Sequence, residues 1–250
     1  MARTALPGRL TWQLTTVTRK QRDTPRVMTL QLASDSWPGH LAGQHVDVRL
    51  TAEDGYQAQR SYSIASAPAI GSLELAVEEI RDGEVSSYLS EVLQPGDQLE
   101  LRGPIGGHFT WSTNDGGPLL LIAGGSGIAP IMSMLRYRKE VGSTIPVTVL
   151  LSFRSWLEII YRDELSRLAM DPGVSVAYTL TRSHPADWLG FDRRIDAPML
   201  AAAGLAPEMG PDVFVCGPTP MVEAVANALV GLGHEPARIR TERFGPTGEG

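Results

Sequence analysis

Hydrophobic and polar positions follow two different rhythms along the 250 residues of this chain. From about residue 10 to 112, short segments alternate apolar and polar side chains, and clusters of Pro, Gly and Asp separate them. Short strands at such spacing predict a small antiparallel β-barrel. The predicted strands cover 27–32, 45–50, 61–64, 73–77 and 98–101, and one short helix covers 86–93.

From Pro118 onward, apolar runs alternate with helical patterns. This order predicts an α/β domain in which helices cover a parallel sheet. A polar, glycine-rich link at 112–117 separates the halves, so we predict a barrel domain at 1–113 and an α/β domain at 114–250. The predicted strands are 119–123, 147–152, 174–180 and 213–216, and the predicted helices are 131–139, 162–169, 198–203 and 221–232.

Composition narrows the class of protein. A hydrophobic share of 42% fits a globular protein with a core, and a net charge of −6 gives no sign of nucleic-acid binding. No segment approaches the roughly 20 apolar residues of a membrane span, and the first residues lack the apolar part of a secretion signal, so we expect a cytoplasmic location. The single cysteine, Cys216, excludes an internal disulfide and a cysteine-ligated cluster, and the five scattered histidines predict no metal site.

A glycine cluster follows the apolar run at 119–123. Gly124, Gly125 and Gly127 precede Pro130, after which apolar residues recur at helical spacing. A buried strand that enters a helix through a glycine turn presents free backbone N–H groups and the positive end of the helix dipole. The pattern therefore predicts an anion site, although glycine turns after strands also occur for structural reasons alone.

A second candidate site lies in the barrel half. Alternation places Arg60 and Tyr62 on one side of a strand, where a guanidinium matches a pyrophosphate and a tyrosine ring can lie on a flat heterocycle. Ser63 adds a hydroxyl. By themselves, residues 60–63 are more typical of a half-buried strand with a surface arginine. The Gly83-Glu84-Val85-Ser86 start of the predicted helix adds a further anion site.

Five motifs occur in one order: RSYS (60–63), GEVS (83–86), GPIGGHF (103–109), AGGSGIAP (123–130) and VFVCGPTPM (213–221). Together they resemble the ferredoxin–NADP reductase family over about residues 10 to 244. This resemblance implies a FAD-binding barrel followed by a pyridine-nucleotide domain. It assigns FAD binding to Arg60, Ser61, Tyr62, Ser63, Val77, Gly83, Val85 and Ser86.

The resemblance also implies roles for individual residues. Arg60 would bind the FAD pyrophosphate, Tyr62 would pack on the flavin, and Ser63 would reach flavin N5. The Val77 backbone would lie along the pyrimidine edge, and Gly83, Val85 and Ser86 would hold the pyrophosphate from the helix start. Many members carry a basic residue just after this strand, whereas this chain has Glu78 and Glu79.

In the second half, the family pattern assigns the pyridine dinucleotide's pyrophosphate to Gly125, Ser126, Gly127 and Pro130. Cys216, Gly217 and Pro218 would lie beside the nicotinamide, where Cys216 would position the ring, although most lone cysteines are simply small buried hydrophobes. Arg154 and the Thr181-Arg182 pair stand at adjacent strand ends, which lack the acidic residue typical of NAD(H) sites, so they favour NADPH over NADH.

The end of the chain keeps the family's Glu-x-aromatic spacing in Glu242 and Phe244. By resemblance, Phe244 would cover the flavin, and Ser63, Cys216 and Glu242 would form the catalytic set. We expect hydride to pass from NADPH to FAD and single electrons to pass on to a separate ferredoxin-like or haem protein. An acidic partner could dock on Arg136, Arg138, Lys139, Arg193 and Arg194, although exposed helix and loop charges are usually only solvated.

Two alternatives remain open at this point. The chain could be an NAD(P)H:flavin or quinone reductase that releases a reduced small molecule. It could also be a non-catalytic electron-transfer subunit of a larger oxidoreductase.

Overall fold

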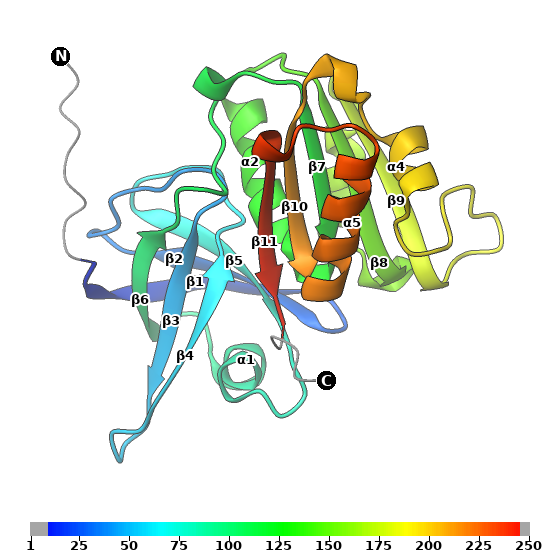
Figure 1. Ribbon diagram of the computed structural model, residues 1–250. Helices are drawn as coiled ribbons and strands as arrows, with labels where there is room; N and C mark the ends of the chain where they lie inside the picture. The colour runs from blue at the N-terminus through cyan, green and yellow to red at the C-terminus, as the bar shows by residue number, and fades with distance from the viewer. Residues whose placement is uncertain (1–9, 246–250) are drawn as a thin grey trace, which may run out of the picture.

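The computed structural model describes residues 10–245, which form two lobes joined side by side (Figure 1). We call residues 10–112 the amino-terminal lobe and residues 118–245 the carboxyl-terminal lobe. Residues 1–9, where we expected no secretion signal, and residues 246–250 lie outside the described part. Within residues 10–245, no helix combines the length and the apolar content that crossing a membrane requires.

The amino-terminal lobe is a six-stranded antiparallel sheet, which confirms the predicted fold class of this half. Its strand order is β4-β3-β6-β1-β2-β5. The edge strands β4 and β5 are linked by a bridge between Ile64 and Leu75, so the sheet curls into a barrel. The strands are β1 (Trp12–Thr24), β2 (Val27–Ala33), β3 (His45–Thr51), β4 (Gln57–Ser63), β5 (Ser72–Glu78) and β6 (Gln98–Ile105).

One helix crosses the open end of the barrel. The helix α1 (Glu84–Ser87) continues as a wider π-helical turn at Tyr88–Val92, whereas the sequence predicted one regular helix at 86–93. Val85, Leu89 and Leu93 are fully buried in the core of the barrel. These apolar contacts hold Gly83, the residue just before α1, next to β4 and β5.

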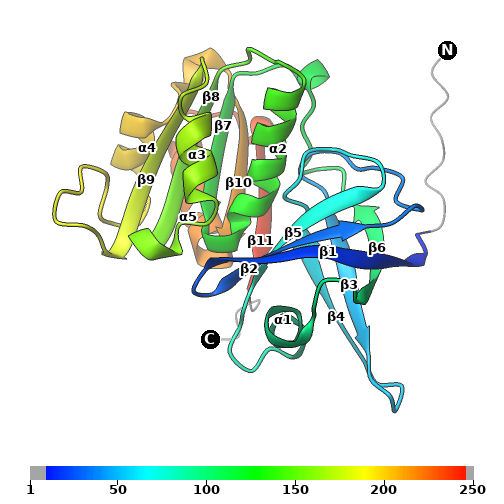
Figure 2. The same cartoon turned by 180° about the vertical axis from the view of Figure 1, so that it is seen from behind.

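The carboxyl-terminal lobe is a five-stranded parallel sheet in the order β11-β10-β7-β8-β9, as the strand–helix alternation predicted. Helices α2 (Ile128–Glu140) and α3 (Arg162–Leu168) cover one face, and α4 (Ala197–Ala203) and α5 (Thr219–Gly231) cover the other (Figures 1 and 2). The strands are β7 (Leu119–Gly124), β8 (Val147–Ser155), β9 (Val174–Ser183), β10 (Asp212–Pro218) and β11 (Ile239–Phe244).

Polar side chains join the lobes. Arg136 on α2 donates to the Ala65 carbonyl oxygen at 2.8 Å and to Glu74 on β5 at 2.6 Å, and it also pairs with Glu164 on α3 at 2.6 Å. The Tyr161 hydroxyl donates to the same Glu74 carboxylate at 3.1 Å. The two lobes are thus held by a charged cluster that α2 carries.

This cluster corrects the expected docking surface. The Arg136 guanidinium is already paired with Glu74 and Glu164. Arg138 is buried and donates to the Ile145 and Pro172 carbonyl oxygens. The prediction of a free docking charge is therefore wrong for both. Lys139 pairs with Asp171, and Arg193 pairs with Asp196.

Candidate active site

The site lies at the point in the parallel sheet where the helices that follow two neighbouring strands pack on opposite faces. Strands β7 and β10 are neighbours, yet the helices that follow them, α2 and α5, pack on opposite faces of the sheet. Ligands of open parallel sheets bind at such a switch point, beyond the carboxyl ends of the strands. The turn at Gly125–Gly127 ends β7, and Cys216-Gly217-Pro218 ends β10, so the structure brings the two predicted nucleotide motifs together.

Close backbone packing explains the glycines of this turn. A Cβ atom on Gly127 would collide with the Cys216 carbonyl oxygen, and one on Gly217 would lie 3.3 Å from the Gly124 nitrogen. Gly125 has a φ of +56°, which favours glycine. Pro130 is buried in the first turn of α2, where its missing N–H costs no helical hydrogen bond. The bare backbone at the start of a 13-residue helix fits a pyrophosphate.

Glu242 is the acidic group at the place where the two lobes meet, which we call the inter-lobe junction and define by His45, Ser63, Cys216 and Glu242. It lies on β11 directly beside Cys216 on β10, and its Oε1 atom is 3.6 Å from Nδ1 of His45 in the other lobe. Burial raises the pKa of Glu242 to about 7 and lowers the pKa of His45. Because burial favours the uncharged form of both groups and 3.6 Å exceeds a hydrogen bond, the contact is not a fixed ion pair near neutral pH.

Ser63 lies near Glu242 because it is the cross-strand neighbour of His45. Ser63 and His45 are directly opposed in the β3–β4 pair, so their side chains lie on one face of the sheet. Burial, and then the charge of Glu242, raise the pKa of the Cys216 thiol, so this cysteine is an uncharged thiol rather than a nucleophile. The three residues predicted to be catalytic therefore lie close to one another where the two lobes meet.

An unpartnered atom at the inter-lobe junction suggests which ligand group could bind there. The Oε2 atom of Glu242 is buried and has no hydrogen-bond partner among residues 10–245. Buried polar atoms of this kind are normally paired. A carboxamide such as that of nicotinamide would supply the missing donor, so the residues present fit a pyridine nucleotide.

The edge strand β4 presents both of its faces. Arg60 and Tyr62 lie on the side that faces the barrel core, opposite Val48 and Val46 of β3, while Ser63 lies on the other side. Burial raises the pKa of Tyr62 to about 12, which keeps its phenol neutral. A flat ring system lying along this edge can contact Tyr62 and Ser63 together, so the strand fits a flavin.

The side chains of three predicted FAD residues, Ser61, Val77 and Ser86, are occupied within the amino-terminal lobe. The Ser61 hydroxyl donates to Asp47 at 2.6 Å on the face away from Tyr62. The Ser86 hydroxyl accepts from the Ile80 N–H and donates to the Gly83 carbonyl oxygen, so it shapes the loop. The Val77 side chain is fully buried. At these positions the main chain is what remains for a ligand.

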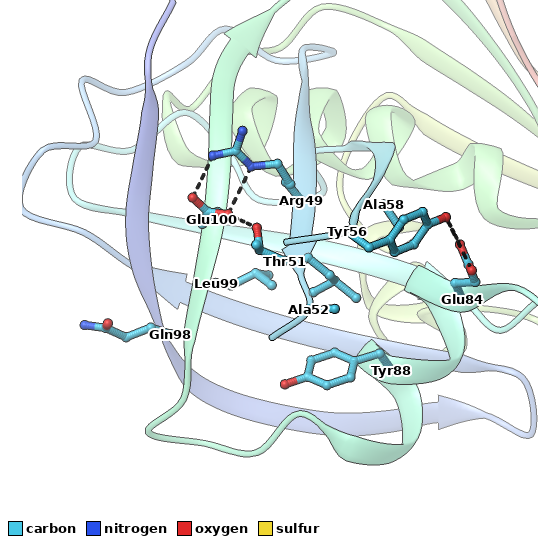
Figure 3. A pocket seen from close by; sticks show the side chains of 11 residues that line it. Arg49, Thr51, Ala52, Tyr56, Ala58, Glu84, Tyr88, Gln98, Leu99 and Glu100 are labelled. Atoms are coloured by element: carbon cyan, nitrogen blue, oxygen red, sulfur yellow. Dashed lines mark hydrogen bonds and ion pairs between the residues drawn. The ribbon is translucent and has the colours of Figure 1, made fainter. Parts of the chain in front are cut away.

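A cavity of about 470 Å³ lies at the end of the barrel beside α1 (Figure 3). Its wall includes Tyr56, whose hydroxyl donates to Glu84 at 3.1 Å, and Ala58, which lies on the same face of β4 as Arg60 and Tyr62. None of the residues predicted to bind a cofactor lines this cavity. Glu84, which lines the cavity, directly follows Gly83 of the predicted pyrophosphate site.

The residues predicted to select NADPH lie at the carboxyl ends of β8 and β9. Arg154 and Arg182 are exposed, and neither has an ion pair or a side-chain hydrogen bond within the described residues. Thr181 donates to the Phe153 carbonyl oxygen at 3.3 Å, which ties the two strand ends together. Phe244 is half-buried opposite Pro218 at the end of β11.

Sequence reasoning missed two residues that make contacts between the lobes. His45 stands in an ordinary strand pattern, and only the packing of β11 against the barrel brings it to Glu242. Glu78 was noted as a departure from a family pattern, but nothing in the sequence showed where its side chain reaches. Its Oε2 atom accepts a hydrogen bond from the Ser126 hydroxyl at 2.9 Å, inside the glycine turn of the other lobe.

Two family models match the chain. A model described as an oxidoreductase FAD-binding domain matches residues 12–111, and one described as an oxidoreductase NAD-binding domain matches residues 121–227. The first match covers the barrel, and the second covers the glycine turn, α2 and the Cys216 motif. The two descriptions name FAD and NAD, the two kinds of cofactor for which the sequence predicts binding residues.

Named relatives agree with these matches. The ferredoxin–NADP reductase B of Sorangium cellulosum is 37% identical over 211 residues, which cover 81% of this chain and 84% of that protein. The glycine betaine monooxygenase reductase subunit of Pseudomonas aeruginosa is 32% identical over 209 residues, which cover 82% of this chain. This alignment covers 56% of that subunit, so the chain spans little more than half of its length.

Solved structures share the arrangement of both lobes. The FAD/NAD-binding domain of a nitric oxide dioxygenase from Vibrio cholerae superposes with a TM-score of 0.83 at 26% identity, covering 93% of this chain and 98% of that one. A cytochrome P450 reductase from Amycolatopsis gives a TM-score of 0.83 at 25% identity, covering 95% of this chain and 71% of that one.

Proposed function

The chain belongs to the ferredoxin–NADP reductase family, and from this premise we propose that it transfers electrons from NADPH through FAD to a ferredoxin-like or haem protein. The observation that carries the proposal is the proximity of Ser63, Cys216 and Glu242 at the inter-lobe junction. Bound FAD would take up a hydride from the pyridine nucleotide and release electrons singly. The domain boundary would fall between residues 113 and 114.

The residues of the chain would bind and align the two ring systems. Tyr62 and Ser63 would contact the flavin from the two faces of β4, and Phe244 would cover its exposed side. The unpaired Oε2 atom of Glu242 would accept a hydrogen bond from the carboxamide of nicotinamide. Cys216 would lie beside the nicotinamide ring and position it. Alignment of two bound rings is how a protein of this class lowers the barrier.

NADPH is the preferred dinucleotide in this proposal. Arg154 and Arg182 extend from neighbouring strand ends without other side-chain partners in the described part, so both guanidiniums are free to bind a 2′-phosphate. Charge-assisted hydrogen bonds from arginine are well suited to phosphate.

The acceptor is proposed from the relatives. One is named a ferredoxin–NADP reductase, one a monooxygenase reductase subunit and one a cytochrome P450 reductase. These names support a protein acceptor over a free flavin or a quinone, and they support turnover over a non-catalytic subunit.

The acceptor is tested by reducing the FAD-loaded protein anaerobically and mixing it with candidate acceptors. We expect electrons to pass to a ferredoxin or a haem protein much faster than to free flavin or a quinone. Faster reduction of the small molecules would favour a flavin or quinone reductase instead. Turnover appearing only with a copurified partner would favour the electron-transfer subunit.

A further inference from the structure

We propose that Glu78 is an internal competitor of the dinucleotide pyrophosphate, supplied by the amino-terminal lobe to the glycine turn of the carboxyl-terminal lobe. The proposal rests on the proposed function, which assigns a pyridine dinucleotide to this turn. Glu78 is the last residue of β5, and its Oε2 atom accepts from the Ser126 hydroxyl at 2.9 Å. The same oxygen lies 3.8 Å from the place of a Cβ atom on Gly125.

A carboxylate at this position occupies a site built for an anion. The turn offers bare backbone, a serine hydroxyl and the positive end of α2. Glu78 uses one of these features, the serine hydroxyl, as a bound anion would. A pyrophosphate entering the turn must therefore displace the carboxylate from Ser126 or bind beside a like charge, and both lower its affinity.

A second contact gives the displaced carboxylate another partner. The Oε1 atom of Glu78 lies 3.4 Å from the Arg26 guanidinium, which also donates to the Glu79 carbonyl oxygen at 3.3 Å. The Glu78 and Arg26 side chains are 30% and 42% exposed. A half-exposed pair of this kind holds its geometry weakly and can rearrange at small cost, so Arg26 can follow the carboxylate when a ligand displaces it from Ser126.

The consequence is weaker binding and faster release of the dinucleotide. Glu78 would return to Ser126 when the oxidised dinucleotide leaves, which favours product release over rebinding. The competition involves only the pyrophosphate, which NADP⁺ and NAD⁺ share, so it should weaken the binding of both dinucleotides alike.

The test compares Glu78→Gln with Glu79→Gln in the FAD-loaded protein. Glutamine at 78 keeps the size of the side chain and can still accept from Ser126, so the fold is retained. Glu79 is the adjacent residue, and its carboxylate has no hydrogen bond or ion pair within residues 10–245, so it controls for net charge. Dissociation constants for NADP⁺ and NAD⁺ are measured by isothermal titration calorimetry, and release rates by stopped flow.

We expect Glu78→Gln to lower the Kd for both dinucleotides by about fivefold to tenfold, mainly through slower release, and Glu79→Gln to change it by less than about twofold. Equal effects of the two variants, or weaker binding by Glu78→Gln, would overturn the competition while leaving the proposed function intact. Absence of dinucleotide binding by the unmodified protein would overturn the proposed function as well.

Discussion

Glu242 and His45 meet across the boundary between the two lobes, with Oε1 of the carboxyl 3.6 Å from Nδ1 of the imidazole. Neither residue reaches the other within its own lobe, so their approach depends on how β11 packs against the barrel. Burial brings the pKa of Glu242 to about 7 and lowers that of His45. A carboxyl that titrates near neutral pH therefore lies next to the place proposed for the nicotinamide.

The first prediction concerns pH. Hydride transfer leaves positive charge on the nicotinamide, and an ionised Glu242 would stabilise that charge. Because the raised pKa keeps the carboxyl protonated below about 7, the rate of flavin reduction by NADPH should rise as pH increases through this value. Stopped-flow rates measured across this range should show the inflection in the unmodified protein. Glu242→Gln should remove it and hold the rate near the low-pH level, and a variant that keeps the same inflection would exclude Glu242 as its source.

A second prediction concerns the contact between the lobes. Arg136→Met would leave the Glu74 and Glu164 carboxylates half-buried without their shared cation, so we expect a loss of about 3 kcal/mol in the free energy of unfolding. Lys139→Met is the matched control on the same helix, because the exposed Lys139–Asp171 pair should contribute less than about 1 kcal/mol. Urea unfolding of both variants measures the difference. Equal losses would mean that the Arg136 cluster adds no more than a surface ion pair.

Gly127 provides a third prediction. Its backbone is in the ordinary right-handed region, so alanine would cause no backbone strain, and any cost must come from the collision of the new methyl group with the Cys216 main chain. We expect Gly127→Ala to cost about 2 kcal/mol or more in stability and to weaken dinucleotide binding. Gly231→Ala, at the end of α5, meets nothing within 4 Å and should be neutral or stabilising. Thermal unfolding of the two variants decides this, and an unaffected Gly127→Ala protein would show that the turn has room for a side chain.

Selectivity gives the fourth prediction. Arg182→Ala should raise the KM for NADPH by at least about tenfold, because one charge-assisted contact to the 2′-phosphate is lost, and it should leave the KM for NADH nearly unchanged. Arg167→Ala serves as the control for net charge, because Arg167 is exposed in the last turn of α3, which leads into the start of β9, whereas Arg182 lies near the end of that strand. Steady-state kinetics with both dinucleotides measure the effect. Equal increases for NADPH and NADH would remove Arg182 from 2′-phosphate recognition.

Local pattern was sufficient for much of the fold and for the outline of the site. The apolar runs located most of the strands, and the glycine motifs located the two turns that meet at the switch point. Pattern failed for β1 and β11, which are largely polar strands. In β1 only Thr15, Val17 and Thr24 are buried, and β11 has no fully buried residue, so their structure depends on pairing with neighbouring strands.

Contacts between the lobes were beyond the reach of sequence reasoning. Helical spacing indicates which side of α2 is apolar, but not what another lobe places against its polar side, so it cannot predict the ion pairs of Arg136 with Glu74 and Glu164. The same limit hid His45 and the reach of Glu78, since each acts on a residue far away in the sequence. At Ser61 and Ser86 the motifs did not show that the hydroxyls bond Asp47 and the Gly83 carbonyl oxygen, and FAD binding there stays a prediction.

The most direct test of the account is anaerobic mixing of the FAD-loaded protein with NADPH while the visible absorbance of the flavin is followed. We expect the purified protein to bind FAD. NADPH should bleach the flavin rapidly, and NADH at equal concentration should bleach it more slowly. A protein that binds no added FAD, or that holds FAD which neither dinucleotide bleaches, would contradict the account.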